Sequence, residues 1–354
     1  MTIINVAAGA AIDPKPAPGT TIRLEGGRHS CVLSLVGWQD VIIDGGAAAE
    51  LWRGRIELTD CQRVTIRGVV FRQAPASAIV FNTGCRDCVV ESCSFLACGI
   101  SEGGVTMWIG AGTSGIAVQR CRFDMLGARG KRHLILNQHC YDIAIMCAED
   151  DCVEHRLLDN RITQYSYGIQ LGVRGICLSE GRHLVQGNRI EYPWADGIHL
   201  KQGRILVKDN TIIGAFKNAM SARAGAASCF VGNRIEDAYL GLVVRGRDHE
   251  IRDNHFERCR RSAISLMDAK AGGDGFAAEN TLVVGNELID CGGADAGPDP
   301  LIDCAGIHLG NDLPQRIGVN RIVGAGTPLL RGQGQAVGVA LNGRGPTDPI
   351  HRGG

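Results

Sequence analysis

A short repeat runs along nearly the whole sequence and constrains the fold more than any other feature. The repeat has apolar residues at its first and third positions and Asn, Cys or Gly at its sixth. It recurs from about residue 41 onward. The most regular copies contain Asn188, Asn210, Asn233 and Asn254, which are separated by 22, 23 and 21 residues. A repeat of this length indicates a solenoid in which each copy forms one coil.

Eleven copies of the repeat can be counted. They are VIIDGG from 41, VTIRGVVF from 64, VVESCSF from 89 and IAVQRCRF from 116, followed by the copies at Asn160, Asn188, Asn210, Asn233, Asn254, Asn286 and Asn320. The spacing does not fit leucine-rich repeats, and a propeller blade needs about 40 residues. We therefore predict an all-β fold, a right-handed parallel β-helix of about eleven or more coils. The recurring Asn should form an amide ladder at the turns.

The repeat also predicts how the chain is organised. We expect one β-helix domain over residues 1–354, with regular coils over about 20–325 and a cap or flexible tail over 326–354. Residues 99–115 and 124–157 break the repeat and are expected to be loops. GAGTSG at Gly110–Gly115 matches a dinucleotide-binding pattern, but a strand follows it where that motif requires a helix, so we reject this interpretation.

Charge and cysteine content limit the partners. The chain of 354 residues has 37 Lys plus Arg and 37 Asp plus Glu, so no overall charge favours nucleic acid or a membrane surface. The start of the sequence lacks the basic residues of a secretory signal, which predicts a cytoplasmic protein as given. Fifteen cysteines, an odd number, predict mostly reduced and buried thiols. A zinc site at Cys85, Cys88, Cys93 and Cys98 lacks the usual ligand spacing.

A second strand precedes each Asn-containing segment, and its copies align without gaps. They are YGIQLG from 167, DGIHLK from 196, NAMSAR from 218, LGLVVR from 240, SAISLM from 262 and AGIHLG from 305. Alternation along a strand places the apolar residues inward and the residues between them outward. The last outward position is Lys201, Arg223 and Arg245 on three consecutive coils. Because neighbouring coils lie about 4.8 Å apart, these three side chains should form one column of cations.

Three stacked cations form an unfavourable arrangement, which indicates function. Like charges about 5 Å apart repel by about 3 kcal/mol at an effective dielectric constant of 20. This repulsion favours the neutral amine of Lys201, which can then act as a base, whereas arginine stays charged. Between Asp196 and Arg261, 12 Lys and Arg face 8 Asp and Glu. The sequence thus predicts a local anion-binding face in a neutral protein.

A cation column with one lysine suits a uronic-acid glycan. The C5 proton of a uronate lies next to a carboxylate, so its removal requires a base and neutralisation of that carboxylate. A proton donor is also needed near the leaving 4-oxygen. The expected partner is an anionic polysaccharide or oligosaccharide, without nucleic acid or membrane, and the protein could act as a monomer or a homo-oligomer.

The stretch from Asp196 to Glu257 resembles polysaccharide lyase family 6, the β-helical alginate lyases and chondroitinase B. The matching segments are DGIHLK, which ends in Lys201, SARAG, which contains Arg223, and VVRGRDHEIRDNHF, which contains Arg245 and His249. The resemblance implies a β-helical lyase in which Lys201 is the base and Arg223 the acid. It also implies a periplasmic or secreted location.

Further site residues complete the prediction. We expect His199, Arg245, His249 and Tyr165 to contact the substrate, and Trp194 or Tyr192 to stack on a sugar. Many members of the resembling family hold Ca²⁺ with acidic residues seven and five positions before the lysine. Here Asp196 occupies the second of these positions, but Trp194 occupies the first. Asp196 is thus a metal-ligand candidate in an incomplete set.

Three alternatives remain open at the level of sequence. A uronate epimerase would use the same proton abstraction and return the proton to the opposite face. A glycoside hydrolase would need paired carboxylates, for which the sequence offers Asp150, Asp151, Glu154, Asp268 and Asp303. A non-catalytic carbohydrate-binding solenoid would usually show long regular surface ladders, whereas the cation column covers only three coils.

Overall fold

The computed structural model describes most of the chain. The described residues are 2–8, 15–46, 48–101, 104–126, 142–172, 179–269, 275–293, 305–324, 327, 329–331 and 335–336. Asp303, most of the expected tail and residues 127–141 of the second expected loop lie outside them.

The described chain consists of short strands that form three long sheets, here called sheets A, B and C. Sheet A contains β1 (Thr2–Val6), β2 (Thr20–Leu24), β5 (Ile42–Asp44), β8 (Thr65–Arg67), β11 (Val89–Glu91), β14 (Ala117–Gln119), β17 (Arg156–Leu158), β20 (Leu184–Gln186), β23 (Leu206–Lys208), β26 (Cys229–Val231), β30 (Glu250–Arg252), β34 (Leu282–Val284) and β37 (Arg316–Ile317). Sheet B contains β3 (Gly27–His29), β6 (Ala49–Trp52), β9 (Val70–Arg72), β12 (Ser94–Leu96), β15 (Arg122–Asp124), β18 (Arg161–Thr163), β21 (Arg189–Glu191), β24 (Thr211–Ile213), β27 (Arg234–Glu236), β31 (His255–Glu257), β35 (Glu287–Ile289) and β38 (Arg321–Val323). Sheet C contains β4 (Val32–Val36), β7 (Arg55–Thr59), β10 (Ile79–Phe81), β13 (Val105–Ile109), β16 (Ile143–Cys147), β19 (Tyr167–Leu171), β22 (Asp196–Leu200), β25 (Asn218–Ala222), β28 (Leu240–Val244), β32 (Ser262–Leu266), β36 (Ala305–Leu309), β39 (Leu329–Arg331) and β40 (Gln335–Ala336).

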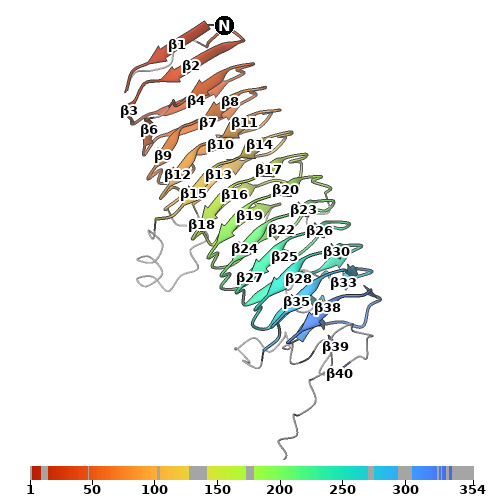
Figure 1. The fold of residues 1–354 in the computed structure, drawn as a ribbon. Helices are drawn as coiled ribbons and strands as arrows, with labels where there is room; N and C mark the ends of the chain where they lie inside the picture. Colours follow the sequence, from red (N-terminus) through yellow and green to blue (C-terminus); the bar gives the residue numbers. More distant parts are fainter. Residues whose placement is uncertain are drawn as a thin grey trace, which may run out of the picture.

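Each coil of the solenoid contributes one strand to sheet C, then one to sheet A and one to sheet B. Strands of successive coils pair in parallel, and the coils stack along one axis from the N-terminal to the C-terminal end (Figure 1). A two-stranded sheet of β29 (Gly246–Arg247) and β33 (Ala278–Glu279) lies outside the three main sheets. The predicted parallel β-helix is therefore confirmed. Sheets A, B and C have 13, 12 and 13 strands in the described chain, because further strands flank the coils recognised in the sequence. The expectation that residues 99–115 and 124–157 are loops is wrong where β13 and β16 lie, since these two strands pair with each other in sheet C.

The core fills the space between the three sheets. Alternate strand residues point inward, so Ile198, Leu200, Val207 and Ile212 of one coil are fully buried. The same positions stack between coils, as in the rings of Phe71, Phe95 and Phe123, whose centroids are 4.9 and 4.5 Å apart. Burial of these columns drives the fold, since apolar area removed from water is its main favourable term.

An asparagine ladder fixes the turn between sheets A and B. Asn210 donates its side-chain N–H to the Oδ1 of Asn233 at 3.0 Å, and its own Oδ1 accepts from the Nδ2 of Asn188 at 2.9 Å. The ladder runs from Asn160 to Asn320 and confirms the predicted role of these residues. Every rung is buried. The ladder satisfies turn groups that would otherwise be buried without partners.

Cysteine takes the ladder position in earlier coils. The backbone N–H of Cys121 donates to the Oδ1 of Asn160 at 3.0 Å, and Cys93 lies one coil before Cys121. The cysteines of the described residues are free, and only Cys31 and Cys229 among them are not fully buried. These thiols act as small core residues, as their number and distribution predicted. No helix of the described chain is long and apolar enough to cross a membrane.

Histidines occupy the turn between sheets C and A. His155 and His183 stack with ring centroids 5.0 Å apart, and the Nδ1 of His183 accepts the backbone N–H of His155 at 3.0 Å. His249 accepts the N–H of Ser228 at 3.2 Å. Burial lowers the pKa of His183 and that of His249 to about 4. These rings are neutral at pH 7 and support the backbone.

Acid should therefore destabilise the protein before its carboxylates titrate. Each ring takes up a proton near pH 6.5 in the unfolded chain but only near pH 4 in the folded one, so stability falls as the pH drops between these values. We expect a loss of about 2 to 3 kcal/mol per ring by pH 4. The free energy of unfolding, measured by urea titration at pH values from 7.5 to 4, tests this expectation.

His249→Gln should reduce this pH dependence and keep the fold. Gln315 supports the same turn position, since its Oε1 accepts the backbone N–H of Thr281 at 3.1 Å. An unchanged pH slope in His249→Gln would show that other groups cause the acid sensitivity.

Candidate functional site

The three predicted cations form one column. Lys201, Arg223 and Arg245 are the first residues after β22, β25 and β28, whose last residues pair directly. The backbone N–H of Arg223 donates to the carbonyl of Leu200 at 2.9 Å, and that of Arg245 to the carbonyl of Ala222 at 2.7 Å. Lys201 and Arg223 are half-buried, whereas Arg245 is only 6% exposed. The column therefore offers two side chains to a ligand and holds the third beneath the surface.

A buried polar network lies beside the column. Asp196 accepts hydrogen bonds from the Nδ2 of Asn218 at 2.8 Å and the Oγ of Ser221 at 2.6 Å, and also pairs with the Nδ1 of His199. His199 and Ser221 lie 2.8 Å apart, and all four residues are at most 4% exposed. His199 lies on the outward face of β22 as predicted, but it is buried where we expected a substrate contact.

The charges of the network follow from its surroundings. Burial raises the pKa of Asp196, but the hydrogen bonds from His199 and Ser221 and the charge of Arg223 outweigh it and hold the pKa at about 2. Burial lowers the pKa of His199, the nearby charges of Arg223 and Lys201 lower it further, and Asp196 opposes them. At pH 7 an ionised Asp196 thus lies beside a neutral His199. The cation column has one buried counter-charge.

The residues around Asp196 do not fit a calcium ion. Calcium takes six to eight oxygen ligands, preferably carboxylates. Both Asp196 oxygens already accept hydrogen bonds, and the side chain of Trp194 at the other candidate position has no oxygen. Within the described ranges, three or more His, Cys, Asp or Glu side chains nowhere gather closely enough for a metal. Asp196 serves as a hydrogen-bond acceptor.

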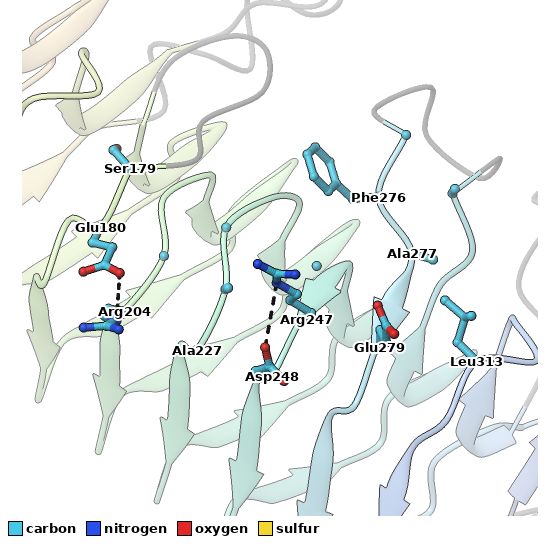
Figure 2. Close-up of a pocket in the computed structure, with 16 residues that line it drawn as sticks. Ser179, Glu180, Arg204, Ala227, Arg247, Asp248, Phe276, Ala277, Glu279 and Leu313 are labelled. Atoms are coloured by element: carbon cyan, nitrogen blue, oxygen red, sulfur yellow. Dashed lines mark ion pairs between the residues drawn. The ribbon is translucent and has the colours of Figure 1, made fainter.

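The connections that begin with these three cations contribute to the lining of a groove of about 750 Å³ (Figure 2). Its floor contains Gly203, Gly225 and Gly246, which follow Lys201, Arg223 and Arg245 by one or two residues. Its remaining lining is Ser179, Glu180, Arg204, Ala226, Ala227, Arg247, Asp248, Ala269, Gly275, Phe276, Ala277, Glu279 and Leu313. The cations themselves do not line this groove. Each of them is the first residue of a connection whose later residues line the groove.

The lengths of the connections between sheets C and A explain the groove. Five, six and five residues follow β22, β25 and β28 before the next strand of sheet A. In contrast, twelve residues follow β19 and fifteen follow β32. Three short connections therefore form a floor between two longer ones, which contribute Glu180 on one side and Phe276 on the other. The cation column and the groove share these boundaries.

Tyr165 and His249, expected to bind substrate, belong to the core. Tyr165 is 1% exposed, and its hydroxyl lies 3.0 Å from the Oγ of Thr106. His249 is fully buried, and its Nε2 lies 3.1 Å from the carbonyl of Arg245. Both side chains are engaged inside the coil, so we correct these two expectations and leave both residues out of the site.

The predicted aromatic surface lies at the other end of the strand. Trp194 precedes β22, whereas Lys201 follows it. Trp194 is 42% exposed and stacks on Phe216, with ring centroids 4.4 Å apart. Tyr192 is also exposed. This pair is accessible but does not line the groove.

Sequence reasoning missed some polar residues of the site. Ser221 and Asn218 occupy strand positions equivalent to His199 and Asp196, so the gapless alignment could have identified them. The acids considered for hydrolysis, Asp150, Asp151, Glu154 and Asp268, are not among the groove residues, and Asp303 lies outside the described chain. Glu180, Asp248 and Glu279 line the groove instead. They belong to connections that carry no repeat signal.

Known proteins share this architecture. A family model described as a right-handed β-helix region matches residues 159–326. Among solved structures, the alginate lyase AlyGC of polysaccharide lyase family 6 is similar with a TM-score of 0.60 and 11% identity, over 93% of this chain and 53% of its own. A mannuronic-acid-specific family 6 lyase from human gut microbiota has a TM-score of 0.60 and 12% identity over 94% of this chain and 83% of its own. A family 6 alginate lyase in complex with a trisaccharide has a TM-score of 0.57 and 12% identity over 92% and 86%.

These similarities define the fold. The chain is a right-handed parallel β-helix like those of polysaccharide lyase family 6, which confirms the expected resemblance at the level of architecture. It spans about half the length of AlyGC. No curated protein matches it by sequence.

The buried carboxylate should stabilise the protein without calcium. Asp196→Asn would turn an amide N–H₂ toward existing donors, so we expect the free energy of unfolding to fall by about 3 kcal/mol. Asp209→Asn, an exposed turn carboxylate, is the control. The Asp196 contribution should be present above about pH 4 and lost as the pH falls toward 2, because folding lowers its pKa.

Calcium should leave thermal stability unchanged. A ligand that binds only the folded state raises the Tm with its concentration. A Tm that rises with millimolar Ca²⁺ in the parent protein and not in Asp196→Asn would contradict our assignment of Asp196.

Proposed function

We propose that the protein is a polysaccharide lyase that cleaves a uronic-acid-containing glycan by β-elimination. The observation that carries this proposal is the arrangement of Lys201 and Arg223. They are half-buried, follow paired strands of adjacent coils, and stand where the floor of the groove begins. The fold shared with family 6 lyases agrees with this proposal.

The reaction would divide between the two side chains. The neutral amine of Lys201 takes the C5 proton, and the electron pair of that C–H bond forms a double bond between C4 and C5. The C4–O bond breaks, and the leaving oxygen receives a proton from Arg223. The two groups must reach the C5 hydrogen and the 4-oxygen, which are carried by adjacent ring carbons, and this suits side chains from neighbouring coils about 4.8 Å apart.

The rest of the site would supply electrostatic support. Positive charge at the substrate carboxylate stabilises the enolate-like intermediate, and the column provides it without a metal. Arg245 is buried and contributes its charge from below. Asp196 and His199 would hold the column in place through the buried network.

Lys201→Ala should abolish the reaction. We expect kcat to fall roughly 10²- to 10⁴-fold, because a general base contributes that factor. Lys201→Arg should be equally inactive, since it keeps the charge but cannot act as a base. The assay follows the ultraviolet absorbance of the new double bond on alginate, dermatan, pectate and glucuronan-type polymers, with and without a chelator. Activity should be the same with chelator.

Lys217→Ala is the matched control, because Lys217 is exposed and lies at the opposite end of β25. Full activity of Lys201→Ala would reject this base even if the protein were a lyase. New reducing ends without ultraviolet absorbance would indicate a glycoside hydrolase. A uronate inverted at C5 without chain cleavage would indicate an epimerase, and binding without turnover a carbohydrate-binding solenoid.

A further inference from the structure

The described residues that line the groove next to the cation column carry no excess of positive charge. Arg204 pairs with Glu180 at 3.0 Å, and Arg247 lies 3.8 Å from Asp248 (Figure 2). Both groove arginines therefore have a carboxylate partner. Glu279 has no ion pair with any residue of the described chain. Among the described lining residues, Glu180, Asp248 and Glu279 outnumber the two arginines by one charge.

The groove also presents an aromatic ring. Phe276 is half-buried at the rim of the groove on the side of Arg247 (Figure 2). Much of the remaining lining is Gly and Ala, which leave room for a ligand close to the backbone. A neutral sugar suits such a surface, because its C–H face packs on an aromatic ring and its hydroxyls donate to carboxylates.

A second uronate does not suit this surface. Its carboxylate would face Glu279 and the partly paired carboxylates of Glu180 and Asp248, and like charges across an interface disfavour binding. Two residues before Gly203 and Gly225 in the same connections, Lys201 and Arg223 favour an anion. The charge preference therefore changes from anionic to neutral within one short connection.

Resting on the proposed function, we infer that the preferred glycan places a neutral sugar beside the uronate that reacts. The uronate lies at Lys201 and Arg223, and its unsulfated neutral neighbour lies over the groove against Phe276. The substrate class is then a glycan that alternates uronate and neutral sugars, and a homopolymer of uronates is a poor substrate.

The inference is tested by comparing polymers that alternate uronate and neutral sugars with homopolymers of uronates. The alternating probes are hyaluronan and unsulfated chondroitin, and the homopolymer probes are alginate and polygalacturonate. We expect kcat/KM to be at least about tenfold higher for one of the alternating polymers, since about 1.4 kcal/mol of repulsion corresponds to a factor of ten. The preference should shrink as salt rises, because the groove carboxylates are exposed and screened.

Glu279→Gln tests the assigned cause. It removes a carboxylate that has no ion pair within the described chain and keeps the shape of the side chain, so we expect kcat/KM for homopolymers to rise about fivefold with little change for alternating polymers. Glu25→Gln, an exposed carboxylate on a distant coil, is the control. Phe276→Ala should lower kcat/KM for alternating polymers several-fold at unchanged Tm.

Binding to Lys201→Ala separates this inference from the proposed reaction. Dissociation constants of alternating and homopolymeric hexasaccharides, measured by calorimetry with this variant, should show the same preference without turnover. Equal or tighter binding of the homopolymer, unaffected by Glu279→Gln, would overturn the inference even if unsaturated products form. A preference for the alternating hexasaccharide without unsaturated product from any polymer would support the inference and contradict the lyase mechanism.

Discussion

The in-register stacking of parallel coils is the constraint on which the rest of this structure depends. Buried amides such as Asn210 and Asn233 bind each other between coils and leave no freedom for a strand to slip. A shift of one residue would also turn every inward side chain outward. Because register is fixed, a residue type that recurs at one repeat position becomes a column in space. The candidate site is such a column, built from strand ends that are distant in sequence.

The same regularity explains what the sequence could predict. Gapless copies of one strand motif were enough to place Lys201, Arg223 and Arg245 in one file, because β-pairing converts alignment into distance. Burial was harder to infer. The sequence alone made Tyr165 and His249 candidate site residues, yet both are buried in the structure. The groove could not be predicted from the sequence, because the connections that form its walls do not follow the repeat.

The polar network shows how a β-helix can carry buried charge beside a cation column. Asp196 would cost several kcal/mol if it were buried alone, but three donors and a nearby guanidinium compensate its desolvation. The negative charge then moderates the repulsion among the stacked cations. His199 pairs with Asp196 and Ser221 and remains neutral. The buried carboxylate of Asp196 thus balances part of the positive charge of the column. The described residues around it do not form a calcium-like ligand set.

The difference between the short and long connections has a consequence for how such a protein can change. The floor turns are tied to the strands beneath them, so altering them would disturb packing through several coils. The flanking connections that contribute Glu180 and Phe276 begin after one strand has ended and end before the next one begins. Their length and composition can vary while the scaffold and its reactive groups stay in place. Ligand selectivity and the stability of the fold therefore depend on different parts of each coil. Changes confined to the flanking connections can alter which ligand binds.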